Sequence, residues 1–206
     1  MTATAGAIIE PNPFSTRRVR PGAIPYLFLR GDSIVQLVSR LRANDWRGQI
    51  IGPHGSGKST LLATLIPELR RAGVAGVVHE LHDWSRRLPA AWNRRVIASR
   101  ETVVVIDGFE LLPWFSRFWM NRRCRERGYG LLVTAHEPVG LPDLYCTNVS
   151  LEAAQRLTSR LVGDEGSLVT ERDVASRLAA NGGDLRATFF DLYDLFEARR
   201  RGHQWK

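Results

Sequence analysis

Two hydrophobic periods alternate along this chain. Short apolar runs predict β-strands over residues 47–51, 74–81, 102–107, 129–134 and 144–149. Elsewhere apolar residues recur at three- and four-residue spacing, which predicts helices over residues 34–43, 59–71, 90–98, 113–127, 151–162, 171–180 and 185–199. The alternation of strands and helices up to residue 150 favours an α/β fold with a parallel sheet and right-handed crossovers.

The same pattern divides the chain into three parts. Residues 1–30 contain four prolines and are expected to form an extended arm. Residues 31–150 carry the α/β pattern, and residues 151–206 form a helical appendage that is too short to be an independent domain. In the helix predicted over 113–127, Trp114, Phe115, Phe118 and Trp119 are expected to bury one side in the core rather than to stack on nucleic-acid bases.

A glycine-rich motif stands between the first strand and the helix that follows it. It satisfies G-x-x-x-x-G-K-[ST] and consists of Gly52, Pro53, His54, Gly55, Ser56, Gly57, Lys58, Ser59 and Thr60. Glycines let the backbone N–H groups turn inward at a helix N-terminus, where they bind phosphate. Lys58 is then placed to reach the β- and γ-phosphates, and the Ser59 hydroxyl to bind Mg²⁺. Lys58 is the only lysine besides Lys206, so the motif keeps a compact ammonium in an arginine-rich chain.

A second candidate site residue, Asp107, ends the β-branched run over residues 102–107. Such a run is typical of a strand buried on both faces of a parallel sheet. Its last residue lies at the carboxyl edge, where open α/β sheets bind ligands. Together with the glycine-rich motif, Asp107 is interpreted as the carboxylate on the Mg²⁺ side of a nucleotide site.

Charge and composition narrow the class of protein. The chain has 206 residues, a net charge of +8 and a pI near 10.4, with the positive charge almost entirely on arginine. The basic clusters are scattered, so a nucleic-acid partner and a mere composition bias both stay open. The chain has only two cysteines, and its first residues lack the basic charge of a signal peptide, so we expect a cytoplasmic protein. We expect no membrane span, because no run of about 18 apolar residues occurs.

These motifs and the helical tail resemble the P-loop ATPases of the additional-strand class, and most closely the AAA+ type, over residues 24–198. The resemblance implies a three-layer α/β/α P-loop NTPase with a parallel sheet and a small C-terminal α-helical lid. It also implies Mg²⁺-dependent binding and hydrolysis of ATP, used as a motor or switch on a protein or nucleic-acid partner. In that family a polar residue ending the fourth core strand senses the γ-phosphate, which corresponds to Thr134. A Gly-x-x-Arg at the start of a lid helix supplies a second sensor, which corresponds to Arg186.

The sequence departs from that family at two places. The glutamate that usually follows the strand-ending aspartate is replaced by Gly108, which leaves Glu110, and less favourably Glu80, to orient the attacking water. No arginine lies between Thr134 and Arg156, where ring-forming members usually carry an arginine finger. The second departure argues against a ring ATPase and leaves the oligomeric state open.

Two other functions share the glycine-rich motif. A P-loop kinase for a small molecule would use the arginine-rich stretch over residues 86–95 as an acceptor or lid region. A nucleotide-dependent nucleic-acid-binding protein that does not hydrolyse ATP would explain Gly108 in place of glutamate. Turnover of ATP without a second substrate separates the ATPase from both.

Overall fold

The chain folds around a five-stranded, all-parallel sheet. The computed structural model describes residues 12–29, 31–81, 102–163 and 168–203, so the helix expected over 90–98 and the stretch over 86–95 lie outside the described residues. The strands are β1 (Arg47–Ile51), β2 (Ala75–Glu80), β3 (Thr102–Asp107), β4 (Gly130–Ala135) and β5 (Asp143–Cys146), in the order β2-β3-β4-β1-β5. The predicted parallel α/β fold is confirmed, and β4 lies between β1 and β3.

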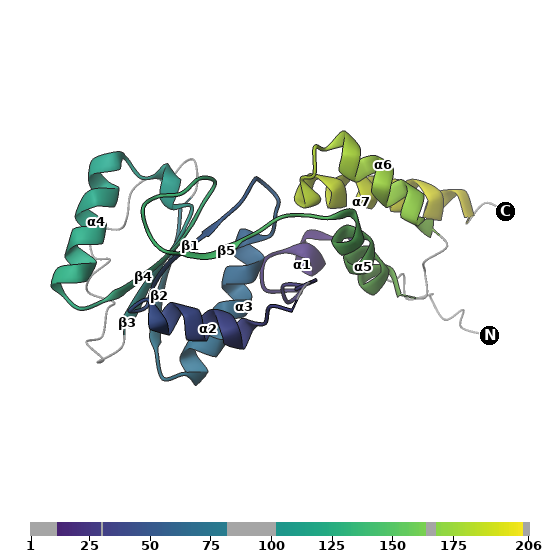
Figure 1. Ribbon diagram of the computed structural model, residues 1–206. Coiled ribbons are helices and arrows are strands. Elements are labelled where there is room, and N and C mark those ends of the chain that lie inside the picture. The colour runs from purple at the N-terminus through teal and green to yellow at the C-terminus, as the bar shows by residue number, and fades with distance from the viewer. Residues whose placement is uncertain (1–11, 30, 82–101, 164–167, 204–206) are drawn as a thin grey trace, which may run out of the picture.

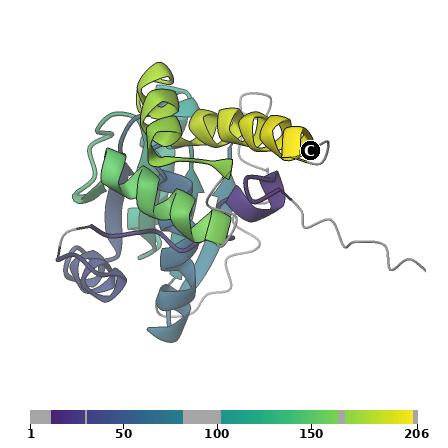
Figure 2. The ribbon, with the colours of Figure 1, turned by 90° about the vertical axis from the view of Figure 1, so that its right-hand side faces the viewer.

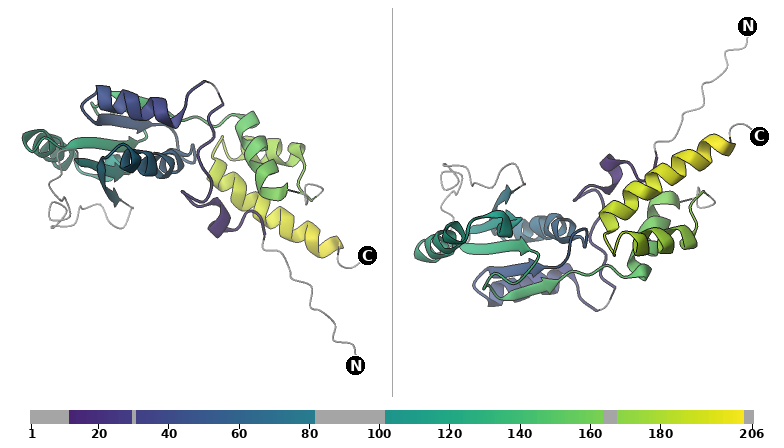
Figure 3. Two further views of the ribbon diagram at one scale, coloured as in Figure 1. Left: turned by 90° about the horizontal axis from the view of Figure 1, so that it is seen from below. Right: turned by 90° about the horizontal axis from the view of Figure 1, so that it is seen from above.

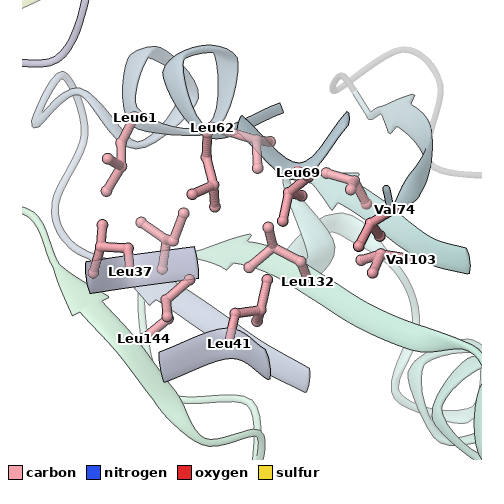
Figure 4. Close-up of a cluster of buried hydrophobic side chains, with 12 residues drawn as sticks. Leu37, Leu41, Leu61, Leu62, Leu69, Val74, Val103, Leu132 and Leu144 are labelled. Atoms are coloured by element: carbon pink, nitrogen blue, oxygen red, sulfur yellow. The ribbon is translucent and has the colours of Figure 1, made fainter. Parts of the chain in front are cut away.

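Helices cover the two faces of this sheet and complete three layers (Figure 1). On one face, α2 (Ile34–Ala43) and α3 (Lys58–Arg71) pack on Ile50, Val103, Val105 and Leu132. Figure 4 shows Leu37 and Leu41 of α2 pointing toward the leucines of α3 and toward Leu132. On the other face, Met120 and Cys124 of α4 (Trp114–Glu126) pack on the alternate residues Val104, Ile106, Leu131 and Val133. This alternation follows from the two-residue period of a strand.

Local sequence explains where the helices begin and end. The side chain of Ser33 accepts the N–H of Gln36 and begins α2 in a capping box. Helix α3 continues through Pro67 and ends at Arg71, before Gly73 takes a φ of +82°. A single proline inside a helix that is well packed against α2 and the sheet therefore does not break it.

The aromatic residues of α4 do not lie in the core, so that prediction was wrong. Trp114, Phe115, Phe118 and Trp119 are 74%, 52%, 58% and 61% exposed, whereas Met120 and Cys124 are buried. Successive residues of a helix differ by about 100° in direction, so the four aromatic positions share one broad face and positions 120 and 124 share another. The sheet contacts the face that carries Met120 and Cys124, and the broad aromatic face points away from the sheet.

The last three helices pack on one another beside the sheet domain. They are α5 (Leu151–Val162), α6 (Glu171–Ala180) and α7 (Leu185–His203), and their shared core includes Ala154, Val174, Leu192 and Phe196. Figures 2 and 3 show α7 crossing beside α5 and α6, with the short helix α1 (Thr16–Val19) next to it. No helix within the described ranges is both long and apolar enough to cross a membrane.

The arm that precedes α2 contacts both parts of the molecule. Phe14 is buried against Phe189 and Phe196 of α7, and Asn12 donates from Nδ2 to the carbonyl of Tyr193 (3.1 Å) and to Glu197 (2.9 Å). Further along, Tyr26 and Phe28 stack edge-on against Tyr145 of β5. The arm includes one helical turn, α1, and joins the helical tail to the sheet domain.

Candidate nucleotide site

The glycine-rich loop leads from the end of β1 to the first turn of α3, as the motif predicts. Gly55 and Gly57 have φ values of +64° and +89°, a region that only glycine adopts without strain, and Gly57 caps α3. A Cβ atom on Gly52 would overlap Thr147, and one on Gly55 would overlap the carboxylate of Asp184. The glycines therefore serve both the turn of the backbone and its close packing.

Most backbone N–H groups at the end of this loop have no acceptor among the described residues, although the N–H of Ser56 bonds to the carbonyl of Pro53. Within the described part of the chain, no hydrogen bond is made by the amides of Gly55, Gly57, Lys58, Ser59 or Thr60, whereas Leu61 N–H already bonds to Gly57. These groups surround the N-terminus of a 14-residue helix, where the helix dipole also favours negative charge. Free donors and dipole together form a site for a polyanion.

The loop is held in shape from the end of β5. Ser56 Oγ lies 2.6 Å from Thr147 Oγ1, and Ser56 also donates to the carbonyl of Pro53 at 2.8 Å. Thr147 is buried and its backbone N–H bonds to Ile51 at the end of β1. Sequence reasoning missed Thr147, because nothing in the motif shows that a residue 91 positions later supports Ser56.

Lys58 lies among acidic residues that are distant in sequence. Its Nζ donates to the carbonyls of Gly52 (2.7 Å) and Pro53 (2.8 Å). Burial lowers the pKa of Lys58 below its ordinary value, and the negative charges of Glu110, Asp107 and Asp184 oppose that effect. The ammonium is therefore partly desolvated, bonds to two backbone carbonyls, and is influenced by the charges of three carboxylates. A phosphate group bound at the loop can take the place of the two carbonyls.

Asp107 and Thr134 form one unit at the carboxyl edge of the sheet. The hydroxyl of Thr134 donates to Asp107 Oδ1 and accepts the backbone N–H of Gly108 at 2.9 Å. Thr134 is 1% exposed, and its single hydroxyl hydrogen is used by this bond. Thr134 thus fixes the orientation of Asp107, and its hydroxyl has no second hydrogen for a phosphate oxygen.

Asp107 and Ser59 offer oxygen ligands of the kind that Mg²⁺ prefers. Within the described residues, no group of three or more His, Cys, Asp or Glu side chains is arranged to hold a metal by itself. A Mg²⁺ ion bound by one or two protein oxygens, water and phosphates needs no such group. The residues present therefore fit the ion that the motif implies.

Of the two candidate carboxylates for orienting water, Glu110 is the one beside the loop. It lies in the 3₁₀ turn η2 (Phe109–Leu111), and His136 Nδ1 is 3.1 Å from its Oε1. Glu80 ends β2, at the sheet edge, with β3 and β4 between it and β1. At about 4.8 Å per strand, that puts the end of β2 about 14 Å from the end of β1.

Arg186 lies in the first turn of α7 and is exposed, and its side chain makes no hydrogen bond or ion pair within the described ranges. Asp184, the acid nearest in sequence, instead accepts the N–H of Ala187 at 2.9 Å. Asp184 lies against Gly55, two residues before Arg186. Asp184 was not expected at this site from sequence.

A small apolar cavity adjoins the loop on the side of the helical tail. It measures about 70 Å³, and its lining includes Tyr26, Gly57, Thr60, Leu157 and Phe189. The arm, the loop and helices α5 and α7 each contribute to it. A flat, apolar group attached to a phosphate chain bound at the loop would have contacts here.

Comparisons with known proteins add little to this geometry. No family model matches the sequence, and no curated protein matches it. Among solved structures the chain is similar to PCH-2 from C. elegans, with 12% identity, a TM-score of 0.37, and coverage of 82% of this chain and 68% of that chain. The roles of individual residues therefore depend on the contacts within this chain.

Proposed function

We propose that this protein binds ATP with Mg²⁺ and hydrolyses it slowly, as an AAA+-like P-loop ATPase that acts as a switch or motor on a partner. The observation that carries the proposal is the set of free amides around the N-terminus of α3 with Lys58 beside them. The insertion of β4 between β1 and β3 also supports it, because this is the arrangement of the additional-strand class.

Each residue has a stated part in this proposal. The phosphates are held by the ammonium of Lys58 and by the free amides of Gly55, Gly57, Lys58, Ser59 and Thr60, and the apolar cavity beside Gly57 takes the base. Ser59 and Asp107 hold Mg²⁺, which neutralises charge on the phosphates, and Thr134 keeps Asp107 in place. Arg186, two residues after Asp184, contacts the γ-phosphate and links its presence to the position of α7.

Titration calorimetry with Mg-ATP tests the first step. We expect saturable binding by the wild-type chain and a loss of at least about 100-fold in affinity for Lys58→Ala, since a charge-assisted contact to phosphate is removed. Arg70→Ala is a matched control, because Arg70 is an exposed cation on the same helix. Unchanged binding in Lys58→Ala, or no binding by the wild type, would refute the proposal.

Release of phosphate tests the second step and separates the alternatives. The ATPase releases phosphate without any other substrate, and Glu110→Gln reduces the rate while Glu80→Gln does not. A small-molecule kinase would bind ATP and show no such release. Binding without turnover by the wild type would favour the nucleotide-dependent binding protein.

The exposed face of α4 favours a second candidate function, the binding of single-stranded nucleic acid. The aromatic surface formed by Trp114, Phe115, Phe118 and Trp119 continues along the helix into exposed arginines at positions 122, 123 and 125. Bases stack on aromatic side chains, and arginines neutralise phosphates, so this combination fits a single strand. It is compatible with the ATPase proposal, since the face lies outside the nucleotide site.

Binding of a fluorescent oligo-dT at several salt concentrations tests this candidate. We expect an affinity that falls steeply with salt, and a reduction of about 10-fold or more for Trp119→Ser, because one stacking contact is worth about 1–3 kcal/mol. Val35→Ser, which removes another exposed apolar side chain, should have no effect. Self-association through the aromatic surface, seen by ultracentrifugation without binding of the oligonucleotide, would contradict this function and assign the face to a protein contact.

A further inference from the structure

His136 lies beside the phosphate loop and next to Glu110, and no motif in the sequence assigns this histidine a role. His136 follows the last residue of β4, and its Nδ1 lies 3.1 Å from Glu110 Oε1. The other carboxylate oxygen of Glu110, Oε2, is buried and has no hydrogen-bond partner in the described structure. A buried acceptor that lacks a partner destabilises the protein unless water or a ligand satisfies it.

The charges around His136 determine its protonation state. Burial lowers its pKa below the ordinary value, the charge of Lys58 lowers it further, and His54 acts in the same direction. Glu110 and Glu137 oppose these effects. A histidine with a lowered pKa is neutral at pH 7, and a neutral ring whose hydrogen is on Nδ1 can donate it to a carboxylate oxygen 3.1 Å away.

The two histidine rings also limit how His136 can turn. The ring centroids of His54, in the glycine-rich loop, and His136 are 3.8 Å apart, with an angle of 46° between the planes. His136 is therefore held from one side by the loop and from the other by Glu110. Thr134 is the residue of β4 that the family resemblance relates to the γ-phosphate, and its hydroxyl donates to Asp107.

We propose that His136 is a positioning residue for the hydrolysis of ATP, which rests on the proposed function. Its Nδ1–H holds Oε1 of Glu110, and this leaves Oε2 facing the water that attacks the γ-phosphate. As the water oxygen bonds to phosphorus, the bond to the β–γ bridging oxygen breaks, ADP leaves, and a water proton passes to Oε2 and then to solvent. A glutamate directly after Asp107 would be oriented by its place in the backbone next to that strand end. Glu110 lies further along the chain, and His136 helps to orient its carboxylate.

The contact itself is tested without ATP. The pKa of His136, followed by NMR of the imidazole signals in the full chain, should fall further in Glu110→Gln, because the carboxylate that stabilises the protonated ring is gone. Asp194→Asn, at an exposed residue of α7, should leave that pKa unchanged. An unmoved pKa in Glu110→Gln would overturn the proposal.

The function of the contact is tested by phosphate release and calorimetry on the same variants. We expect His136→Ala and Glu110→Gln to reduce kcat by about 10–100-fold, the size of a weakened general-base effect, with the ATP dissociation constant within about threefold of wild type. His136→Asn, whose amide can donate to Oε1, should recover part of kcat. Glu137→Gln, a neighbouring exposed acid, should retain the wild-type kcat.

These results separate the two proposals. Normal ATP binding with a wild-type kcat in His136→Ala would overturn the role of His136 and leave the ATPase intact. Normal ATP binding with no turnover in the wild type would overturn it as well, since there would be no attacking water to position. Absence of ATP binding by the wild type would refute the proposed function itself.

Discussion

Asp184, at the start of α7, lies directly against Gly55 of the phosphate loop, so closely that a Cβ atom on Gly55 would overlap its carboxylate. The contact joins the helical tail to the anion site, and it puts a negative charge where phosphates would bind. Asp184 also contributes to the acidic surroundings of Lys58. The tail is therefore placed to respond to whether the loop holds a nucleotide.

Removal of that charge should strengthen the binding of ATP. We expect Asp184→Asn to increase the affinity by about 3–10-fold at low salt, because one repulsion against the triphosphate is lost. Asparagine is also a good cap, so α7 should keep its first turn. Calorimetry with Asp194→Asn, the same change at an exposed position of α7, provides the control. A weaker affinity in Asp184→Asn would show that the carboxylate supports the loop rather than opposing the ligand.

The arm should be essential for the stability of the tail. Phe14 is 1% exposed and packs on Phe189 and Phe196, so Phe14→Ala should cost about 3–5 kcal/mol of the free energy of unfolding. Phe190→Ala, at a residue that is 46% exposed on the same helix, should cost less than about 1 kcal/mol. Urea unfolding followed by circular dichroism measures both, and equal losses would contradict the docked arm.

An ion pair within the tail should make its stability depend on pH. Arg199 donates to both carboxylate oxygens of Asp173 (2.6 and 2.9 Å), and Thr170 also bonds to it, which holds the pKa of Asp173 well below its usual range. A lowered pKa in the folded state stabilises the protein above the unfolded pKa of about 3.9, and the effect is lost as the pH falls below it.

Asp173→Asn should therefore cost about 1–2 kcal/mol at pH 7, the sum of a helix cap and a partly exposed ion pair. The difference from wild type should shrink as the pH falls below about 4, because the Asp173 carboxylate of the unfolded wild-type chain then takes up a proton while that of the folded chain stays charged. Urea unfolding at several pH values measures it, with Asp194→Asn as the control. A difference that stays constant down to pH 2 would assign the cost to packing.

Substitutions on the outward face of α4 should hardly change the stability of the protein. Trp119 is 61% exposed and its neighbour Met120 is 4% exposed, so Trp119→Ser should change the free energy of unfolding by less than about 0.5 kcal/mol. Met120→Ala should cost about 2–5 kcal/mol, because it opens a cavity against the sheet. Chemical denaturation of the two variants compares them, and a large loss in Trp119→Ser would return the aromatic residues to the core.

The elements of the sheet could be predicted because their signals are local. The apolar runs around Val104 and Leu132 are buried on both faces, and such runs have few alternatives to a parallel strand. The loop from Gly52 to Thr60 could be predicted for the same reason, since its turn, free amides and helix start all follow from adjacent residues. The exposure of the aromatic face of α4 could not be predicted in this way. The pattern of apolar residues shows that the helix has apolar faces, but it does not show which face packs on the sheet.

The sequence by itself therefore determined the α/β fold, the phosphate loop and the acid at the end of β3, each of which depends on neighbouring residues and on backbone geometry. Only the tertiary structure decided that Thr134 is bonded to Asp107, that His136 lies beside Glu110, and that Asp184 lies against Gly55. These pairs are set by which strand ends and helix starts meet at one edge of the sheet. Contacts between residues so far apart in the chain leave no periodic pattern in the sequence. Each residue of such a pair fits the local pattern of its own strand, turn or helix, and that local pattern does not show which distant residue it will meet.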